Sequence, residues 1–201
     1  MSFSDDEVDR YARQLVLREI GGAGQQRLKN ATVALIGAGG LGAPAALYLA
    51  AAGVGTLRLI DADTVALSNL QRQVIYGGSD VGQTKVEAAS RRLAALNPHV
   101  AVQMRAVNLT SANAAELIAG CDLVLDGTDD FSTRFAVNAA CRAADIPLLC
   151  PFPEDAPMLK TLALTTCLGL ILATPSLAET YTDPDPAWWN AFLETLDGTA
   201  P

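Results

Sequence analysis

The sequence has few of the residues from which metal sites and nucleic-acid surfaces are built. It contains a single histidine, four cysteines and only 14 basic residues among 201. The cysteines are scattered and form no Cys-x-x-Cys pair, so neither a compact disulfide framework nor a four-cysteine zinc site is encoded, and zinc is not expected. The net charge of -8 argues against nucleic acid or an anionic membrane as the main partner. Reduced thiols in a cytoplasmic protein are the simplest interpretation.

The chain does have enough apolar sequence for a sizeable core. Half of its residues are hydrophobic and 18% are charged, which argues against disorder. The length fits one α/β domain, or one domain with an appendage. Cys121, Cys141 and Cys150 lie in or beside apolar segments and are expected to be buried packing residues. The N-terminus is acidic and lacks an apolar stretch, so it is not a signal peptide.

Apolar runs alternate with helical segments over most of the chain. Strands are predicted at residues 32–36, 56–60, 100–107, 123–125 and 147–149, and helices at 41–52, 84–96, 112–119 and 131–144. Two N-terminal helices are predicted before them, one from Ser4 to about Ile20 that opens with a Ser-x-x-Glu capping box, and one over 23–28. This alternation predicts an α/β fold, a Rossmann-like doubly wound and mostly parallel sheet with helices on both faces.

A glycine-rich turn follows the first predicted strand and opens a helix. Gly37, Gly39 and Gly42 form the pattern G-x-G-x-x-G, and Gly40 adds a fourth glycine. Such a turn lets the backbone approach a phosphate, and the helix N-terminus supplies unpaired N–H groups. Asp61 ends the next strand, where an acid can bind ribose hydroxyls. The motif indicates an adenine nucleotide and does not choose between NAD and ATP.

The residues that follow the second strand favour ATP. Polar side chains lie just past the strand end, where ligands of open α/β sheets bind; they include Asp63, Asn69, Arg72 and Gln73. Lys85 follows on the next helix and Arg13 lies on the first. Three cations in an otherwise acidic chain suggest a polyanion such as a triphosphate. Each cation taken alone is equally consistent with a solvated surface residue.

Several carboxylates follow the fourth strand. Carboxylates beside a triphosphate suggest Mg²⁺, which prefers oxygen ligands. Aspartate is also common at helix N-caps. Asp130 directly precedes the helix that begins at Phe131 and is expected to be such a cap, so Asp129 is the metal candidate.

Five motifs together resemble the ThiF/MoeB/HesA proteins, the bacterial relatives of ubiquitin-activating enzymes. They lie at residues 10–14 (RYARQ), 37–42 (GAGGLG), 61–73 (DADTVALSNLQRQ), 81–85 (VGQTK) and 126–129 (DGTD), so the resemblance covers roughly residues 5–150. It implies adenylation, with ATP and Mg²⁺, of the C-terminal glycine of a ubiquitin-like sulfur carrier that ends in Gly-Gly. Such carriers serve molybdopterin or thiamine biosynthesis.

The resemblance also implies roles for individual residues. Asp61 should hold the ribose, Asp129 should sit at Mg²⁺, and the phosphates should be contacted by Asn69, Arg72 and Lys85. Arg13 matches a residue that reaches the ATP of the partner subunit, which implies a homodimer. Where the family usually has Asp-Asn, this chain has Asp129 followed by Asp130.

The resemblance ends near residue 150, which predicts an incomplete adenylation domain over residues 1–150. Residues 151–157 are rich in proline and typical of a linker. Residues 158–201 open with a basic start at Lys160, a short apolar stretch and a small-x-small end, the parts of a signal peptide. They are expected to be either an unrelated fused tail or a helix that covers the sheet.

Three functions stay open from the sequence. The first is a working sulfur-carrier adenylyltransferase. The second is a truncated relative that binds ATP weakly or not at all and adenylates nothing. The third is an NAD-dependent oxidoreductase, which only the glycine motif favours.

Overall fold

A five-stranded parallel sheet forms the centre of the described chain. The computed structural model describes residues 3–150. The strands are β1 (Thr32–Ile36), β2 (Thr56–Ile60), β3 (Ala101–Arg105), β4 (Leu123–Asp126) and β5 (Leu148–Leu149). They pair in parallel in the order β3-β2-β1-β4-β5. The chain therefore winds outward from β1 to β3 and returns to the other side of β1 with β4, which confirms the doubly wound α/β fold.

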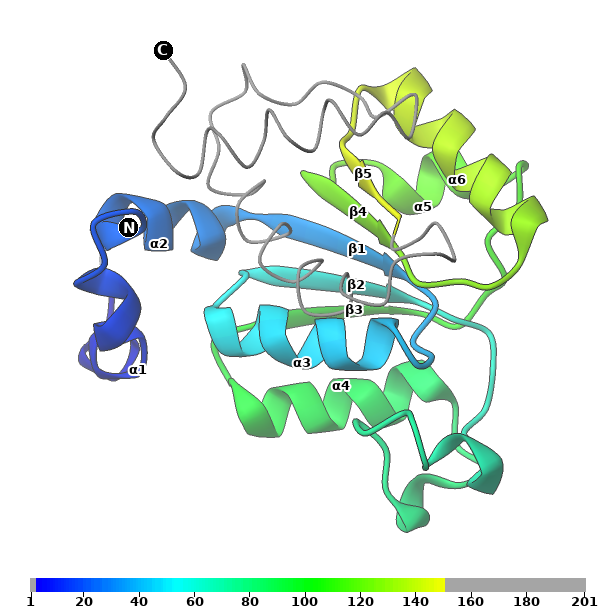
Figure 1. Ribbon diagram of the computed structural model, residues 1–201, viewed down its shortest axis with the longest axis horizontal. Coiled ribbons are helices and arrows are strands. Elements are labelled where there is room, and N and C mark those ends of the chain that lie inside the picture. The colour runs from blue at the N-terminus through cyan, green and yellow to red at the C-terminus, as the bar shows by residue number, and fades with distance from the viewer. Residues whose placement is uncertain (1–2, 151–201) are drawn as a thin grey trace.

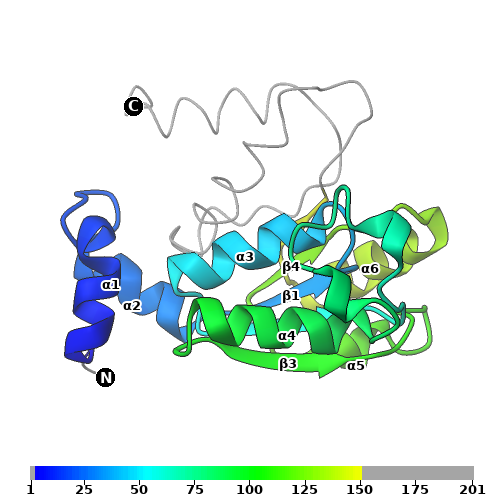
Figure 2. The ribbon, with the colours of Figure 1, turned by 90° about the horizontal axis from the view of Figure 1, so that it is seen from below.

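Helices cover both faces of this sheet (Figure 1). They are α1 (Asp5–Leu15), α2 (Gly21–Asn30), α3 (Gly42–Ala52), α4 (Lys85–Leu96), α5 (Ala114–Ile118) and α6 (Phe131–Ala144), with the short 3₁₀ turns η1 (Leu67–Asn69) and η2 (Gly78–Asp80) between β2 and α4. The helices α3 and α4 pack on one face, and α5 and α6 pack on the other. The helix pair α1 and α2 lies at the amino end of β1 (Figures 1 and 2).

Two apolar layers hold these helices on the sheet. Successive side chains of a strand point to opposite faces. Val33 and Leu35 of β1 therefore pack with α3 and α4, whereas Ala34 and Ile36 pack with α5 and α6. All four side chains are buried. A strand covered on both faces has to be apolar throughout, which is why β1 appears in the sequence as an uninterrupted apolar run.

Four predicted elements differ from the structure by more than one residue: three are shorter in the structure and one is longer. The first helix ends at Leu15 and not near Ile20, because Val16 and Leu17 are exposed and the chain turns there before α2 begins. The predicted strand at 100–107 covers Ala101–Arg105, and the predicted helix at 112–119 covers Ala114–Ile118. The predicted helix at 23–28 extends over Gly21–Asn30.

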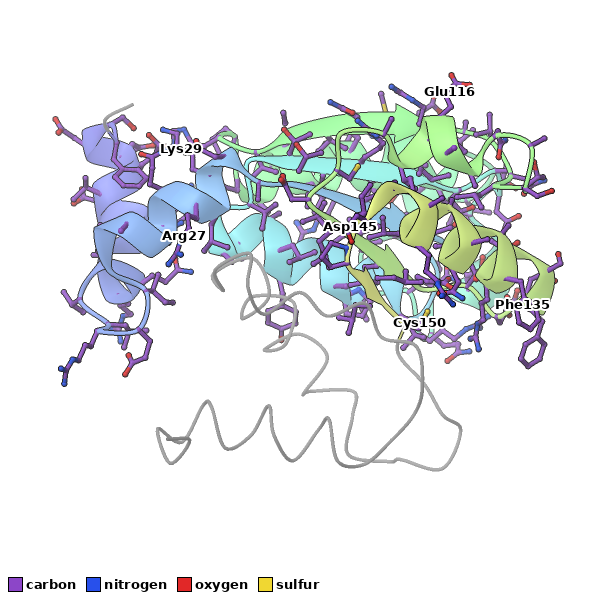
Figure 3. The ribbon with its side chains drawn as sticks, turned by 90° about the horizontal axis from the view of Figure 1, so that it is seen from above. Arg27, Lys29, Glu116, Phe135, Asp145 and Cys150 are labelled. Atoms are coloured by element: carbon purple, nitrogen blue, oxygen red, sulfur yellow. The ribbon has the colours of Figure 1, made fainter. Side chains whose placement is uncertain are left out.

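The cysteines differ in burial. Cys121 and Cys141 are buried as predicted, and burial raises the pKa of Cys141 to about 12. The prediction for Cys150 is wrong, because this residue is exposed. It follows β5, which pairs only with β4 among the described strands, and it is labelled at the end of that strand in Figure 3. Its Sγ donates a long hydrogen bond, 3.7 Å, to Oδ2 of Asp126.

The predicted linker at 151–157 and the predicted tail at 158–201 lie outside the described residues. Among residues 3–150, no helix combines the length and the apolar character that crossing a membrane requires.

An ion pair between a buried glutamate and a partly exposed lysine joins the two N-terminal helices. Ser4 and Glu7 form the predicted capping box of α1, in which the Glu7 N–H donates to Oγ of Ser4 at 3.3 Å. Glu7 also accepts from Nζ of Lys29 on α2, at 2.7 Å, and only 4% of Glu7 is exposed (Figure 3). The hydrogen bonds from Lys29 and from the Ser4 backbone lower the pKa of Glu7 to about 2.

This ion pair predicts a stability change in acid. Because the pKa of Glu7 is lower in the folded chain than in the unfolded chain, its stabilisation is complete above about pH 4.5 and is lost as the pH falls toward 2. We expect Glu7→Gln to lower the free energy of unfolding by about 1–2 kcal/mol at pH 7. The difference from the wild type should shrink below pH 4. Urea unfolding at several pH values measures both effects.

The exposed Glu19 supplies the control for this experiment. Glu19→Gln should change the free energy of unfolding by less than about 0.5 kcal/mol, both at pH 7 and below pH 4. A Glu7→Gln chain whose stability follows the wild type at pH 7 would show that the ion pair contributes nothing.

Candidate functional site

The turn between β1 and α3, residues 37–42, is called the glycine loop here. It is so tight that backbone meets backbone: a Cβ atom on Gly42 would lie 1.9 Å from the carbonyl oxygen of Gly37. Gly37 has a φ of +84°, and a Cβ there would lie 3.2 Å from Cγ2 of Thr128 and 3.3 Å from the Gly127 carbonyl. The glycine loop therefore lies between the carboxyl ends of β1 and β4. In doubly wound sheets this reversal of strand order is where ligands bind.

The glycine loop presents open hydrogen-bond donors. Within residues 3–150, the backbone N–H groups of Gly39, Gly40 and Leu41 donate to no acceptor. No side chain caps α3, whose first turn follows directly. The N-terminus of a helix carries partial positive charge, and unpaired N–H groups there favour an anion. This end of α3 is therefore suited to a phosphate group.

Side chains from two other segments fix Ala38, which lies between the first two glycines. Its N–H donates to Oδ2 of Asp61 at 2.7 Å, and its carbonyl oxygen accepts from the hydroxyl of Tyr76 at 2.8 Å. The other oxygen of Asp61 accepts the N–H of Asp63 at 2.8 Å. Each carboxylate oxygen has two lone pairs, so Asp61 can still accept a ribose hydroxyl. Its role in ribose binding stays a prediction.

Lys85 is buried beside these carboxylates at the start of α4. Its Nζ lies 2.7 Å from Oδ2 of Asp63 and 3.8 Å from Oδ2 of Asp61, and 7% of its side chain is exposed. A buried ammonium group needs such compensation. Three of the predicted residues therefore meet in one hydrogen-bonded cluster that also holds the glycine loop.

The segment 69–76 lies against the same loop. A Cβ on Gly40 would lie 3.6 Å from Cδ of Arg72, and a Cβ on Gly39 would lie 3.7 Å from Nε2 of Gln73. Gln73 is 3% exposed, and its Oε1 has no hydrogen-bond partner within the part of the chain that the structure describes. A buried acceptor of this kind needs a donor, and a bound ligand or a water molecule could supply one.

The carboxylates after β4 divide into a helix cap and an open group. Asp130 accepts from the Thr133 N–H at 2.7 Å, which confirms it as the N-cap of α6, and hydrogen bonds from Thr133 and Ser132 lower its pKa to about 2. Asp129 is exposed, and its side chain makes no hydrogen bond to any of residues 3–150. It follows Thr128, which touches the glycine loop. The metal role of Asp129 stays a prediction.

Asn69 and Arg13 make no hydrogen bond to the glycine loop within the described residues. Asn69 turns back on η1 and accepts a backbone N–H three residues earlier, at 3.2 Å. Arg13 is exposed on α1, whose Gln14 contacts the carbonyl of Ala52 at the far end of α3. The glycine loop is at the other end of this helix, which has 11 residues and is about 16 Å long. The helix α1, which carries Arg13, is therefore remote from the glycine loop of its own chain (Figure 1).

Sequence reasoning did not select Tyr76. No motif marks an aromatic residue in a connecting segment, and its partner is a backbone carbonyl far away in the sequence. Its only sequence signal is its place three residues after Gln73, directly behind the apolar pair Val74 and Ile75.

The fold and the glycine loop define an α/β protein of the Rossmann type. The sequence matches the ThiF family over residues 11–151, and the chain belongs to that family.

Curated relatives and a solved structure agree with this assignment. The chain is 51% identical over 146 residues to the probable adenylyltransferase/sulfurtransferase MoeZ of Mycobacterium tuberculosis, which covers 73% of this chain and 37% of MoeZ. It is 48% identical over 149 residues to the sulfur carrier protein adenylyltransferase of Thermus thermophilus. That match covers 74% of this chain and 55% of the Thermus protein. The chain is also similar to a solved structure, the Escherichia coli tRNA N6-threonylcarbamoyladenosine dehydratase TcdA in complex with ATP. The TM-score is 0.71 at 31% identity, and the match covers 75% of this chain and 61% of TcdA. The chain thus spans between about a third and two thirds of each relative.

The tight glycine loop predicts a loss of stability when a side chain is added to it. Gly42→Ala places a Cβ against the Gly37 backbone, which cannot move without shifting the loop. We expect its melting temperature to fall by roughly 5 °C. Gly78→Ala is the matched control, because a Cβ there meets nothing within 4 Å, and it should melt within about 1 °C of the wild type. Equal melting temperatures for both variants would contradict the described loop geometry.

Proposed function

We propose that this chain carries the nucleotide-binding part of an adenylyltransferase that activates the C-terminal glycine of a ubiquitin-like sulfur carrier. The observation that carries the proposal is the glycine loop, which has open N–H groups and lies beside Arg72 and the cluster of Lys85, Asp61 and Asp63. The similarity to a sulfur carrier protein adenylyltransferase supports the substrate class. The carrier and the complete activity remain proposals, because the chain spans only part of its relatives.

The residues present fit ATP. The open N–H groups of Gly39 and Gly40 are suited to phosphate oxygens, Arg72 supplies a guanidinium group beside Gly40, and Asp61 has lone pairs left for the ribose. The Oε1 of Gln73, which has no hydrogen-bond partner among residues 3–150, offers an acceptor to a hydroxyl or amine of the nucleotide.

The residues also fit a magnesium ion that is held largely by phosphate. Residues 3–150 contain no group of three or more His, Cys, Asp or Glu side chains that could hold a metal. Mg²⁺ commonly needs only one or two carboxylates beside phosphate oxygens and water, and Asp129 offers one. When bound, the ion would neutralise charge on the departing pyrophosphate.

In the proposed reaction, a terminal carboxylate oxygen of the carrier attacks the α-phosphorus of ATP. A new phosphorus–oxygen bond forms, the bond to the β-phosphate oxygen breaks, and pyrophosphate leaves with its electron pair. The contribution of this chain is positioning and charge neutralisation. The glycine loop fixes the phosphates, while Arg72 and Lys85 place positive charge beside the oxygens on which negative charge grows.

Pyrophosphate exchange tests this proposal. The chain is incubated with ATP, Mg²⁺, labelled pyrophosphate and a carrier that ends in Gly-Gly. Label should enter ATP only when the carrier is present, because exchange needs the acyl adenylate. Binding of ATP without exchange would identify a relative that binds nucleotide and adenylates nothing. Tighter binding of NAD than of ATP would favour an oxidoreductase instead.

A pair of aspartate variants controls the exchange assay. Asp129→Asn removes the proposed metal carboxylate and should lower the exchange rate about 100-fold. Asp145→Asn changes an aspartate at the other end of α6, in a left-handed conformation that asparagine tolerates, and should leave the rate within twofold. Equal rates for the two variants would reject the metal role of Asp129.

We further propose that Arg13 completes the site of a partner in a homodimer. The support is its remoteness from the glycine loop of its own chain and its exposure on α1. Arg13→Ala and Lys85→Ala should each be inactive, whereas an equal mixture should regain about a quarter of the wild-type rate, since half of the dimers then contain one intact site. A mixture of Arg72→Ala with Lys85→Ala is the control and should regain nothing. Failure of the first mixture to recover would contradict action across the dimer.

A further inference from the structure

The segment 69–76 contacts the glycine loop at successive residues. Arg72 lies over Gly40 and Gln73 lies beside Gly39. Tyr76 continues this series, because its hydroxyl donates to the carbonyl oxygen of Ala38 at 2.8 Å. Tyr76 is 6% exposed, so water does not compete well for this bond.

The peptide group between Ala38 and Gly39 transmits the effect of this bond. A trans peptide is planar, and its C=O and N–H point in opposite directions. The Tyr76 hydroxyl holds the C=O of Ala38 on one side of the loop. The N–H of Gly39 is therefore directed to the other side, where it donates to none of the described residues.

The preceding peptide group is fixed independently. The N–H of Ala38 donates to Asp61, so the planes on both sides of Ala38 are held by side chains. Ala38 itself is 4% exposed, and its carbonyl would lack a partner without Tyr76. A buried unpaired carbonyl is costly, so loss of the hydroxyl favours rotation of the peptide plane toward another donor.

The Tyr76 hydroxyl keeps its proton, and so stays a hydrogen-bond donor, at every physiological pH. Burial raises the pKa of Tyr76 well above its usual value, and the negative charges of Asp61, Asp80 and Asp63 raise it further. The phenol therefore stays protonated and cannot become an acceptor that would repel the Ala38 carbonyl.

We propose that Tyr76 is a positioning residue that directs the Gly39 N–H at the bound nucleotide through the carbonyl of Ala38. The inference rests on the proposed function, in which that N–H meets a phosphate oxygen. It assigns Tyr76 an indirect role and predicts that the hydroxyl, not the ring, matters for nucleotide binding.

Nucleotide affinity gives the first test. Tyr76→Phe keeps the ring and removes the hydroxyl, and we expect the Kd for ATP with Mg²⁺, measured by calorimetry on the full chain, to rise about tenfold. Tyr11→Phe is the matched control. Tyr11 is also buried, and its hydroxyl accepts from Asn97 at 2.8 Å, but it lies on α1, away from the glycine loop. Loss of the Tyr11 hydroxyl should lower the melting temperature and change the Kd for ATP by less than twofold.

Two outcomes of the binding test would overturn the proposal. One is an ATP affinity of Tyr76→Phe within twofold of the wild type. The other is an equal loss of affinity in Tyr76→Phe and Tyr11→Phe. That result would show a general loss of structure and no specific effect on the direction of the Gly39 N–H.

A second measurement needs no nucleotide. In the ligand-free chain, the amide resonance of Gly39 should shift or broaden in Tyr76→Phe and should keep its wild-type position in Tyr11→Phe. An unchanged Gly39 amide in Tyr76→Phe overturns the proposal. If the wild-type chain bound no ATP, the proposed function would fail, and this amide measurement would still decide whether Tyr76 orients the loop.

Discussion

The candidate site depends on the close approach of backbone segments at the end of β1. The carbonyl of Gly37 occupies the place where a side chain of Gly42 would lie, and a Cβ on Gly127 would come within 3.1 Å of the Gly42 nitrogen. With no side chains between them, the start of α3, the end of β1 and the segment after β4 lie against one another. The N–H groups of the glycine loop stay open because no side chain caps the start of α3.

Much of this arrangement could be predicted from the sequence, because the constraints that produce it are local. The apolar run at residues 32–36 and the glycine spacing after it predict a buried strand, a tight turn and a helix start. The Ser4 and Glu7 pair and the Asp130 cap are likewise signalled within a few residues of the element they begin. The alternation of strands and helices was sufficient to predict the doubly wound sheet.

The remainder depends on contacts between distant segments, which local patterns do not reveal. The bond from Tyr76 to Ala38 joins residues that are 38 positions apart. The compensation of Lys85 by Asp61 and Asp63 requires α4 to start beside the end of β2. Cys150 was predicted to be buried because its neighbours are apolar, but its position after a strand that pairs only with β4 among those described leaves it exposed.

The two hydrogen bonds to the backbone of Ala38 have a thermodynamic consequence. Fixing the backbone of one residue costs about 1–2 kcal/mol in conformational entropy at 25 °C. In this chain that cost is met during folding, since Asp61 and Tyr76 hold the loop without any ligand. A molecule that binds there encounters donors that are already oriented, so less of its interaction energy is spent on ordering the polypeptide.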